Sequence, residues 1–133
     1  PHNYVSLDEL LKTSDVVSIH VPLNDSTNLL LNYKKLCKLK RGSILINTSR
    51  GEIIDEEIIL DLLKSGRLAG FATDVLSDEF KGDANWLEKS KLRKYALDNN
   101  NIIITPHIGG VTAQSVEKAN NFMIEKLSKY LNA

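Results

Sequence analysis

The chain has 133 residues, and its 17 Lys or Arg balance 17 Asp or Glu, so the formal net charge at neutral pH is zero. This balance gives no electrostatic reason to expect nucleic acid or an anionic membrane as a partner. No apolar run approaches the roughly 20 residues of a membrane span, and no signal peptide is visible. Cys37 is the single cysteine, which excludes an internal disulfide and favours a cytoplasmic location.

Helix and strand signals alternate along the chain. Ser6 and Glu9 have the spacing of a capping box, Asn32 and Asp55 are N-cap candidates, and Gly66 is a typical helix stop. In chain order the sequence predicts a helix over 7–12, a strand over 16–21, a helix over 33–38, a strand over 43–46, a helix over 56–65, a strand over 68–75, a helix over 86–97, a strand over 101–105 and a helix over 113–131. Such alternation predicts an α/β fold with a parallel sheet and right-handed crossovers.

Three features are interpreted as structural. Cys37 is read as a packing residue in its helix rather than a reactive thiol. The acidic cluster at 55–57 suits the positive end of a helix dipole, so we predict a helix start there and no metal site. In the last helix we predict that Met123 is a core residue and not a cofactor contact, because it belongs to a stripe at helical spacing made by Val116, Asn120, Met123, Leu127 and Tyr130.

Residues that could take part in binding or catalysis stand at the ends of the predicted strands. They are Val21-Pro22 after the first strand, Thr48-Ser49-Arg50 after the second, Asp74 in the third and His107 after the fourth. Taken singly, Arg50, Asp74 and His107 can each be explained without function, as a surface Arg, an Asp that shapes a turn and a His with a structural role. In a parallel sheet these ends lie along one edge, where ligands bind. Their convergence therefore predicts a site.

Glu79 lies five residues beyond Asp74 and adds a carboxylate to this edge. If it folds back toward His107, an imidazole, a carboxylate and the Arg50 guanidinium meet in one cleft. A carboxylate beside an imidazole favours the imidazolium and raises the pKa of the ring, which suits a general acid. An Arg nearby can hold an anionic substrate in place.

Several segments, in order, resemble the signatures of the D-isomer-specific 2-hydroxyacid dehydrogenases, a family that includes phosphoglycerate dehydrogenase and hydroxypyruvate reductase. They are Ser-Leu-Asp-Glu-Leu-Leu at 6–11, Asp-Val-Val-Ser-Ile-His-Val-Pro-Leu at 15–23, Asn-Thr-Ser-Arg-Gly at 47–51, Gly-Arg-Leu-Ala-Gly at 66–70, Thr-Asp-Val-Leu-Ser-Asp-Glu at 73–79 and Thr-Pro-His-Ile-Gly-Gly at 105–110. The similarity covers nearly the whole chain.

The resemblance implies a catalytic role for three residues. Arg50 would bind the substrate carboxylate and polarise its keto oxygen, His107 would act as the general acid or base, and Glu79 would hold His107 protonated. The implied reaction is hydride transfer between NAD, or NADP, and a small 2-hydroxy or 2-keto acid, in which the cofactor carries the hydride.

The resemblance also implies a set of cofactor contacts. Asp74 would orient the nicotinamide carboxamide, and Gly109 and Gly110 would let the backbone approach the nicotinamide. The residues expected to line the dinucleotide are Val21, Pro22, Thr48 and Ser49.

For the architecture, the resemblance implies a partial Rossmann-like, doubly wound parallel sheet of about four strands with flanking helices. Since the chain opens with Pro1 and lacks the Gly-x-Gly-x-x-Gly motif, we expect a fragment of a larger two-domain enzyme. Residues 1–110 would be the second half of the dinucleotide-binding domain, and residues 111–133 a C-terminal helix that packs on a substrate domain.

Three expectations about behaviour follow from that architecture. The complete enzyme would be a homodimer, while this chain alone would have little activity and would self-associate through the uncovered strand at 16–21. No nucleic acid or membrane partner is expected. The competing interpretation is a nucleotide-sensing, corepressor-like binding protein built on the same fold.

Overall fold

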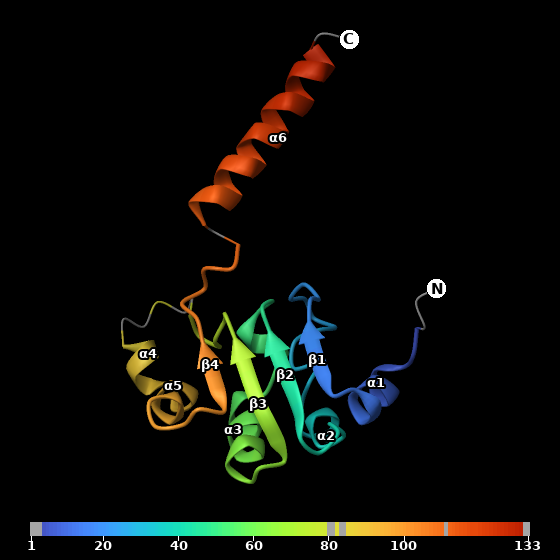
Figure 1. Cartoon of the computed structure of the whole chain (residues 1–133), viewed down its shortest axis with the longest axis vertical. Coiled ribbons are helices and arrows are strands. Elements are labelled where there is room, and N and C mark those ends of the chain that lie inside the picture. Colours follow the sequence, from blue (N-terminus) through green and yellow to red (C-terminus); the bar gives the residue numbers. More distant parts are fainter. Residues whose placement is uncertain (1–3, 80–81, 83–84, 111, 132–133) are drawn as a thin grey trace.

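A parallel sheet of four strands organises the chain in a computed structural model, which describes residues 4–79, 82, 85–110 and 112–131. The strands are β1 (Val16–Ile19), β2 (Ser43–Asn47), β3 (Leu68–Thr73) and β4 (Ile102–Ile104). They lie in the order β1-β2-β3-β4, and each neighbouring pair is parallel (Figure 1). The predicted α/β class with a parallel sheet of about four strands is therefore confirmed.

Helices connect these strands or follow the last of them, and three helices begin at the predicted caps. They are α1 (Leu7–Thr13), α2 (Tyr33–Leu36), the short 3-10 helix η1 (Gly51–Ile53), α3 (Glu56–Lys64), α4 (Trp86–Lys89), α5 (Lys91–Ala96) and α6 (Ala113–Leu131). The side chains of Ser6, Asn32 and Asp55 each accept a hydrogen bond from a backbone N–H in the first turn of the helix that follows. No helix in the described part of the chain is both long and apolar enough to span a bilayer.

Several predicted ends differ from the structure by one or two residues, including those of the helix predicted over 33–38 and the strand predicted over 68–75, and one predicted helix is divided. The helix predicted over 86–97 is divided into α4 and α5 at Ser90, whose extended backbone ends the first helix while its Oγ accepts from the N–H of Arg93 and caps the second. The strand predicted over 16–21 stops at Ile19, because β2, its only partner strand in the described part of the chain, ends opposite at Asn47.

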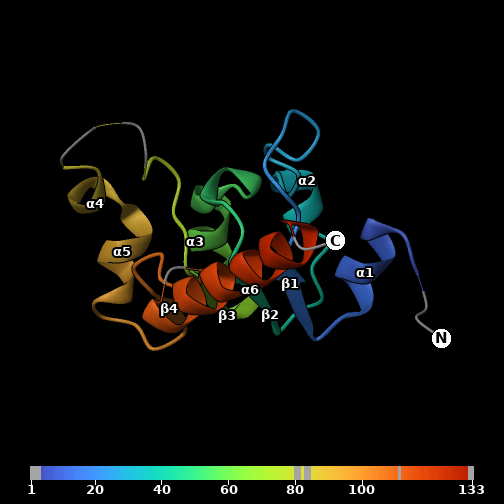
Figure 2. The same ribbon diagram turned by 90° about the horizontal axis from the view of Figure 1, so that it is seen from above.

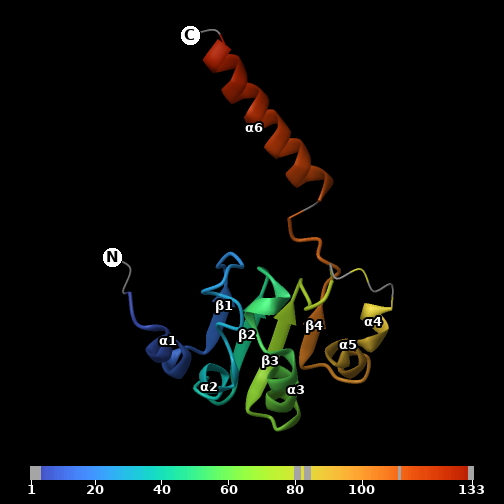
Figure 3. The same cartoon turned by 180° about the vertical axis from the view of Figure 1, so that it is seen from behind.

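The core lies between one face of the sheet and the helices α2, α3 and α5, which share one side of it (Figures 2 and 3). Alternate strand residues point into this core, and those that are buried include Val17, Ile19, Leu45, Phe71 and Ile102. Burying one such side chain contributes roughly 1.5–3 kcal/mol. The buried face fixes the register of the strands, and with it the positions of the loops at their carboxyl ends.

The long final helix, α6, does not contribute to this core. It extends away from the sheet (Figure 1), and no residue of α6 is buried. Met123 is 64% exposed, so the prediction that it is a core residue is wrong for this chain. Helical periodicity correctly identified an apolar face, but the described residues place nothing against it.

Candidate active site

The loop after β2 is shaped by the buried side chain of Asn47. Its Nδ2 donates to the carbonyl of Arg50 at 2.9 Å, and its Oδ1 accepts from the N–H of Ser49 at 3.1 Å. The hydroxyl of Ser49 donates to the carbonyl of Ile19 at 2.9 Å and so ties this loop to the end of β1. Sequence reasoning assigned Asn47 no role, although a polar residue ending a buried strand was a usable signal.

The Arg50 guanidinium lies at this edge but is exposed. Its Nη1 donates to the carbonyl of Ser49 at 2.6 Å. The pocket described below is lined by Glu79 and His107 and not by Arg50. The structure thus brings two of the three predicted catalytic residues into contact and leaves the third on the neighbouring loop.

Gly51 allows the loop after β2 to touch the segment after β3. A Cβ at this position would lie 2.2 Å from the backbone carbon of Leu76 and 2.2 Å from the backbone nitrogen of Ser77. The contact is reinforced by Glu56, whose Oε1 accepts from the N–H of Ser77 at 2.5 Å. Burial raises the pKa of Glu56, and this effect outweighs the lowering by its hydrogen bond from Ser77.

Asp74 ties the end of β3 to the turn after β4. Its Oδ1 accepts from the Thr105 hydroxyl at 2.5 Å and the Ile108 N–H at 3.0 Å, and its Oδ2 accepts from the Gly109 N–H at 2.7 Å. Burial acts to raise the pKa of Asp74, but these three hydrogen bonds and the charge of His107 together hold it below its ordinary value. The carboxylate therefore belongs structurally to the turn that carries His107.

His107 is held by this turn and by Glu79. Its backbone has a φ of 52°, in the left-handed region that few non-glycine residues adopt. Its Nδ1 lies 2.7 Å from Oε2 of Glu79, whose Oε1 accepts from the Leu76 N–H at 2.6 Å. The prediction that Glu79 folds back toward His107 is confirmed. Because both oxygens of Glu79 are engaged, the imidazole is fixed in orientation.

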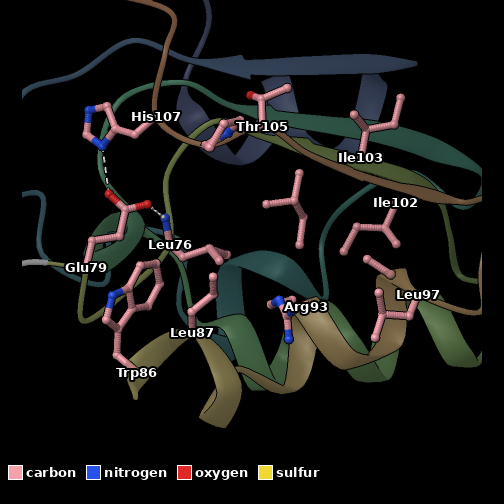
Figure 4. Close-up of a pocket in the computed structure, with 13 residues that line it drawn as sticks. Leu76, Glu79, Trp86, Leu87, Arg93, Leu97, Ile102, Ile103, Thr105 and His107 are labelled. Carbon is pink, nitrogen blue, oxygen red and sulfur yellow. Dashed lines mark hydrogen bonds and ion pairs between the residues drawn. The ribbon is translucent and has the colours of Figure 1, made fainter. Parts of the chain in front are cut away.

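A pocket of about 950 Å³ opens beside this pair. In Figure 4, His107 and Glu79 stand at one end, and apolar side chains of β4, α4 and α5 line the remainder. Those apolar residues include Trp86, Leu87, Leu97, Ile102 and Ile103. The arrangement places one acid–base pair at the border of a largely apolar concavity, which Arg93 and Thr105 also line, and such a concavity is typical of a ligand site.

The remaining predicted site residues lie at the same edge. Val21 and Pro22 follow β1, Thr48 follows β2, and all three are exposed, as are Gly109 and Gly110. Among the described residues, and apart from its chain neighbours, no atom lies within 4 Å of the place a Cβ would take at Gly110, so the backbone there is open to close approach. At Gly109 a Cβ would lie 2.9 Å from Oδ2 of Asp74, so glycine there serves the turn. These residues fit a dinucleotide that lies along the strand ends.

Comparison with known proteins agrees with this geometry. Residues 1–109 match the model of the family described as "D-isomer specific 2-hydroxyacid dehydrogenase, NAD binding domain". The chain is 37% identical over 131 residues to a hydroxypyruvate reductase of Thermotoga maritima, covering 98% of this chain and 40% of that protein. It is 42% identical over 125 residues to a D-3-phosphoglycerate dehydrogenase of Haemophilus influenzae, covering 94% of this chain and 29% of that protein.

A solved structure shares the fold. The D-lactate dehydrogenase of Aquifex aeolicus, crystallised with NAD and lactic acid, superposes with a TM-score of 0.76 at 33% identity, covering 98% of this chain and 41% of that one. The chain thus spans less than half the length of these relatives. The family match extends over most of the chain and contains every catalytic candidate, so this protein belongs to the D-isomer specific 2-hydroxyacid dehydrogenase family, within its NAD binding domain.

Proposed function

We propose that this chain supplies the nicotinamide side of a D-2-hydroxyacid dehydrogenase, which transfers hydride between NAD and a 2-hydroxy or 2-keto acid. The observation that carries the proposal is the contact between Nδ1 of His107 and Oε2 of Glu79, 2.7 Å long, at the carboxyl edge of a parallel sheet. An imidazole oriented by a carboxylate is the arrangement that general acid–base catalysis requires.

His107 is the proposed acid–base residue. Because Nδ1 faces the Glu79 carboxylate, the proton exchanged with substrate is the one on Nε2. In reduction that proton goes to the substrate oxygen, and in oxidation Nε2 takes it back. Glu79 stabilises the positive charge of the protonated ring and, with both oxygens engaged, prevents the ring from turning.

Arg50 is the proposed anchor for the substrate carboxylate. A guanidinium can donate two parallel hydrogen bonds to a carboxylate, and Arg50 is exposed at the correct edge of the sheet. In the structure its Nη1 donates to Ser49, which leaves other N–H groups of the fork for a ligand. Binding of substrate would then align the 2-carbon with His107 by moving only this side chain.

The residues proposed to hold NAD are Val21, Pro22, Thr48, Ser49, Asp74, Gly109 and Gly110. When bound, the nicotinamide supplies the group that accepts or donates the hydride. Asp74 accepts three hydrogen bonds, and an ionised carboxylate has about four acceptor positions, so it retains capacity for a carboxamide donor. NADP remains an alternative, because the sequence has no residue that we can assign to the ribose selector.

The family relationship also supports proposals about the larger enzyme. Its substrate would be a small 2-hydroxy or 2-keto acid, it would form a homodimer, and it would be cytoplasmic. We keep the proposed division into residues 1–110 as part of the dinucleotide-binding domain and 111–133 as a helix that packs on a substrate domain. The names of the relatives cited above, a reductase and two dehydrogenases, lend no support to the corepressor alternative.

A chimera tests the catalytic assignment. The matching segment of the Haemophilus influenzae relative would be replaced by this chain, and NADH-dependent reduction of keto acids would be followed by absorbance. We expect His107→Gln to lower kcat by about 10²–10⁴-fold. The matched control is His20→Gln. His20 follows β1 and shares a hydrogen bond with the Ser18 hydroxyl, so this substitution should change kcat only a few-fold.

The result that contradicts the assignment is an active chimera in which both His variants behave alike. Glu79→Gln supplies a second readout, because it keeps an acceptor oxygen for Nδ1 while removing the charge. It should lower kcat and move the pH profile, whereas a merely structural role for Glu79 would leave that profile in place.

A further inference from the structure

A second carboxylate holds the segment 76–79, which brings Glu79 back from the end of β3 to His107. Oε1 of Glu56, the first residue of α3, accepts from the N–H of Ser77 at 2.5 Å. Glu56 is not among the described residues that line the pocket beside His107. We propose that Glu56 is a positioning residue, which fixes this segment and so holds Glu79 where it can orient His107. The inference rests on the proposed function of that pair and adds a residue to it.

Two carboxylates bind two successive backbone N–H groups of the segment. Oε1 of Glu79 accepts from the N–H of Leu76 at 2.6 Å (Figure 4). The N–H of the next residue, Ser77, is bound by Glu56. Such hydrogen bonds to an ionised acceptor are roughly twice as strong as those between neutral groups. The bond of Glu79 lies within the segment, whereas Glu56 is 21 residues away from Ser77 along the chain and belongs to α3. The bond of Glu56 therefore ties the segment to that helix.

The start of α3 does not by itself require a carboxylate in this place. Asp55 caps the helix by accepting a hydrogen bond from its first turn, and Glu57 adds a negative charge to the same turn. Glu57 is exposed and pairs with Lys91, whereas Glu56 reaches inward to Ser77. Burial opposes the ionisation of this carboxyl and raises the pKa of Glu56. The helix start therefore accounts for Asp55 and Glu57, and the segment that Glu56 binds accounts for its inward position.

Close packing makes the position of the segment depend on Glu56. A Cβ at Gly51 would lie 2.2 Å from backbone atoms of the segment, so the segment cannot move toward η1. Asp78 has a φ of 73°, in the left-handed region, so the chain turns sharply just before Glu79. Without the bond from Glu56, the segment can move away from α3. Glu79 would then move with it and leave its 2.7 Å contact with Nδ1 of His107.

Catalysis is sensitive to small displacements of such a segment. A misplacement of about 1 Å in a group that orients the reacting atoms can lower the rate by about 10²-fold. Without Glu56, the bond between Glu79 and the Leu76 N–H would remain, so the segment is loosened on one side only. We therefore expect an effect of about tenfold on kcat. The KM for NADH should change by less than about twofold, because the residues proposed to hold NAD lie outside the segment.

Kinetics of the chimera described above test the proposal. Glu56→Ala should lower kcat by about tenfold. Glu56→Gln should restore most of the rate, because the amide oxygen of Gln can still accept from the N–H of Ser77. Glu57→Ala is the matched control, since it removes the neighbouring carboxylate from the same turn of α3. Glu57 pairs with Lys91 on the exposed side, so its loss should change kcat by less than about twofold.

A double variant shows whether Glu56 acts through Glu79. In a chain that already carries Glu79→Ala, the position of the segment no longer matters to His107, so adding Glu56→Ala should change kcat by less than about twofold. Glu56→Ala alone should also move the pH profile in the same direction as Glu79→Gln does. A merely structural role for Glu56 would leave the profile in place, and its effect on kcat would multiply with that of Glu79→Ala.

NMR of this chain alone separates the inference from the proposed function. Because Nδ1 of His107 faces the Glu79 carboxylate, the neutral ring should carry its proton on Nδ1, which the nitrogen chemical shifts of the ring report. The same tautomer is expected in Glu56→Gln and Glu57→Ala. In Glu56→Ala the ring should become a mixture of the two tautomers. Circular dichroism and a cooperative urea transition check that each variant folds. If Glu56→Ala does not fold, Glu56→Met replaces it, because Met fills the space without a strong acceptor.

The proposal fails if Glu56→Ala keeps kcat within about twofold of the natural chimera, if Glu57→Ala lowers kcat equally, or if the Nδ1 tautomer of His107 persists in Glu56→Ala. A natural chimera without activity would contradict the proposed function instead. In that case the tautomer of His107 in this chain decides the inference by itself.

Discussion

Replacing Asp74 by Asn should release the turn that carries His107. The carboxylate receives donors from Thr105, Ile108 and Gly109 at 2.5, 3.0 and 2.7 Å. Asn keeps one oxygen for two of these donors and turns an NH₂ group toward the third. The substitution therefore weakens two charge-assisted hydrogen bonds by about 1 kcal/mol each and leaves the Gly109 N–H opposed by a donor, which costs about 1 kcal/mol more.

We therefore expect Asp74→Asn to lower the free energy of unfolding by roughly 3 kcal/mol, measured by urea denaturation at neutral pH. Asp25→Asn, in an exposed loop, is the control and should change it by less than about 0.5 kcal/mol. In NMR spectra the amide signals of Ile108 and Gly109 should move most. A loss below about 1 kcal/mol with unmoved turn amides would refute the assignment of Asp74 to this turn.

The same reasoning predicts a pH dependence. The pKa of Asp74 is lowered in the folded chain, so its stabilisation is present above the ordinary value of 3.8 and is lost as pH falls through the folded value. The difference in stability between the natural chain and Asp74→Asn should therefore shrink on acidification below about pH 4. A difference that stays constant from pH 7 to pH 3 would contradict the lowered pKa.

Three further predictions concern positions away from the catalytic pair. Gly51→Ala should lower the free energy of unfolding in urea by about 3 kcal/mol or more, because its Cβ would meet backbone atoms at 2.2 Å. Gly70→Ala is the control and should be tolerated, because the nearest contact of its Cβ would be at 3.7 Å. Equal effects of the two substitutions would contradict this reasoning. Burial raises the pKa of Glu56, so ionisation of this carboxyl opposes folding. Glu56→Gln should therefore raise the free energy of unfolding at pH 7 and lose this gain below about pH 4.5. A gain in stability that persists in acid would contradict the raised pKa. NMR titration should find the pKa of Asp8 at about 2, because Lys35 and Lys38 donate hydrogen bonds to its carboxylate. In a Lys35→Met/Lys38→Met variant the pKa of Asp8 should return to near the ordinary 3.8, and a pKa that stays low there would contradict the assignment to the two lysines.

Local signals in the sequence were sufficient for much of the fold. The caps at Ser6, Asn32 and Asp55 marked helix starts, and the final helix was predicted with the bounds Ala113–Leu131 that the structure has. Such signals act over three or four residues, so they are readable without tertiary contacts. The division at Ser90 was missed because serine is compatible both with a helix interior and with a cap.

The parts that sequence could not predict depend on contacts between distant residues. The three donors to Asp74 lie 31–35 residues away along the chain, so nothing near Asp74 indicated that it holds a turn. The exposure of Met123 has the same origin, since an apolar stripe indicates that a face will be covered without indicating by what. The pairing of Glu79 with His107 was predicted because the resemblance to a known family supplied the long-range contact.

Titration of the chain with NADH is the measurement that tests the central claim most directly. Trp86 is the only tryptophan and lines the pocket beside His107 and Glu79, so energy transfer to NADH and calorimetry can be followed together. We predict saturable binding near 1 mM, equivalent to about −4 kcal/mol, and weaker binding by Asp74→Asn. No heat and no fluorescence change up to several times that concentration would contradict the claim that these strand ends form the nicotinamide side of a cofactor site.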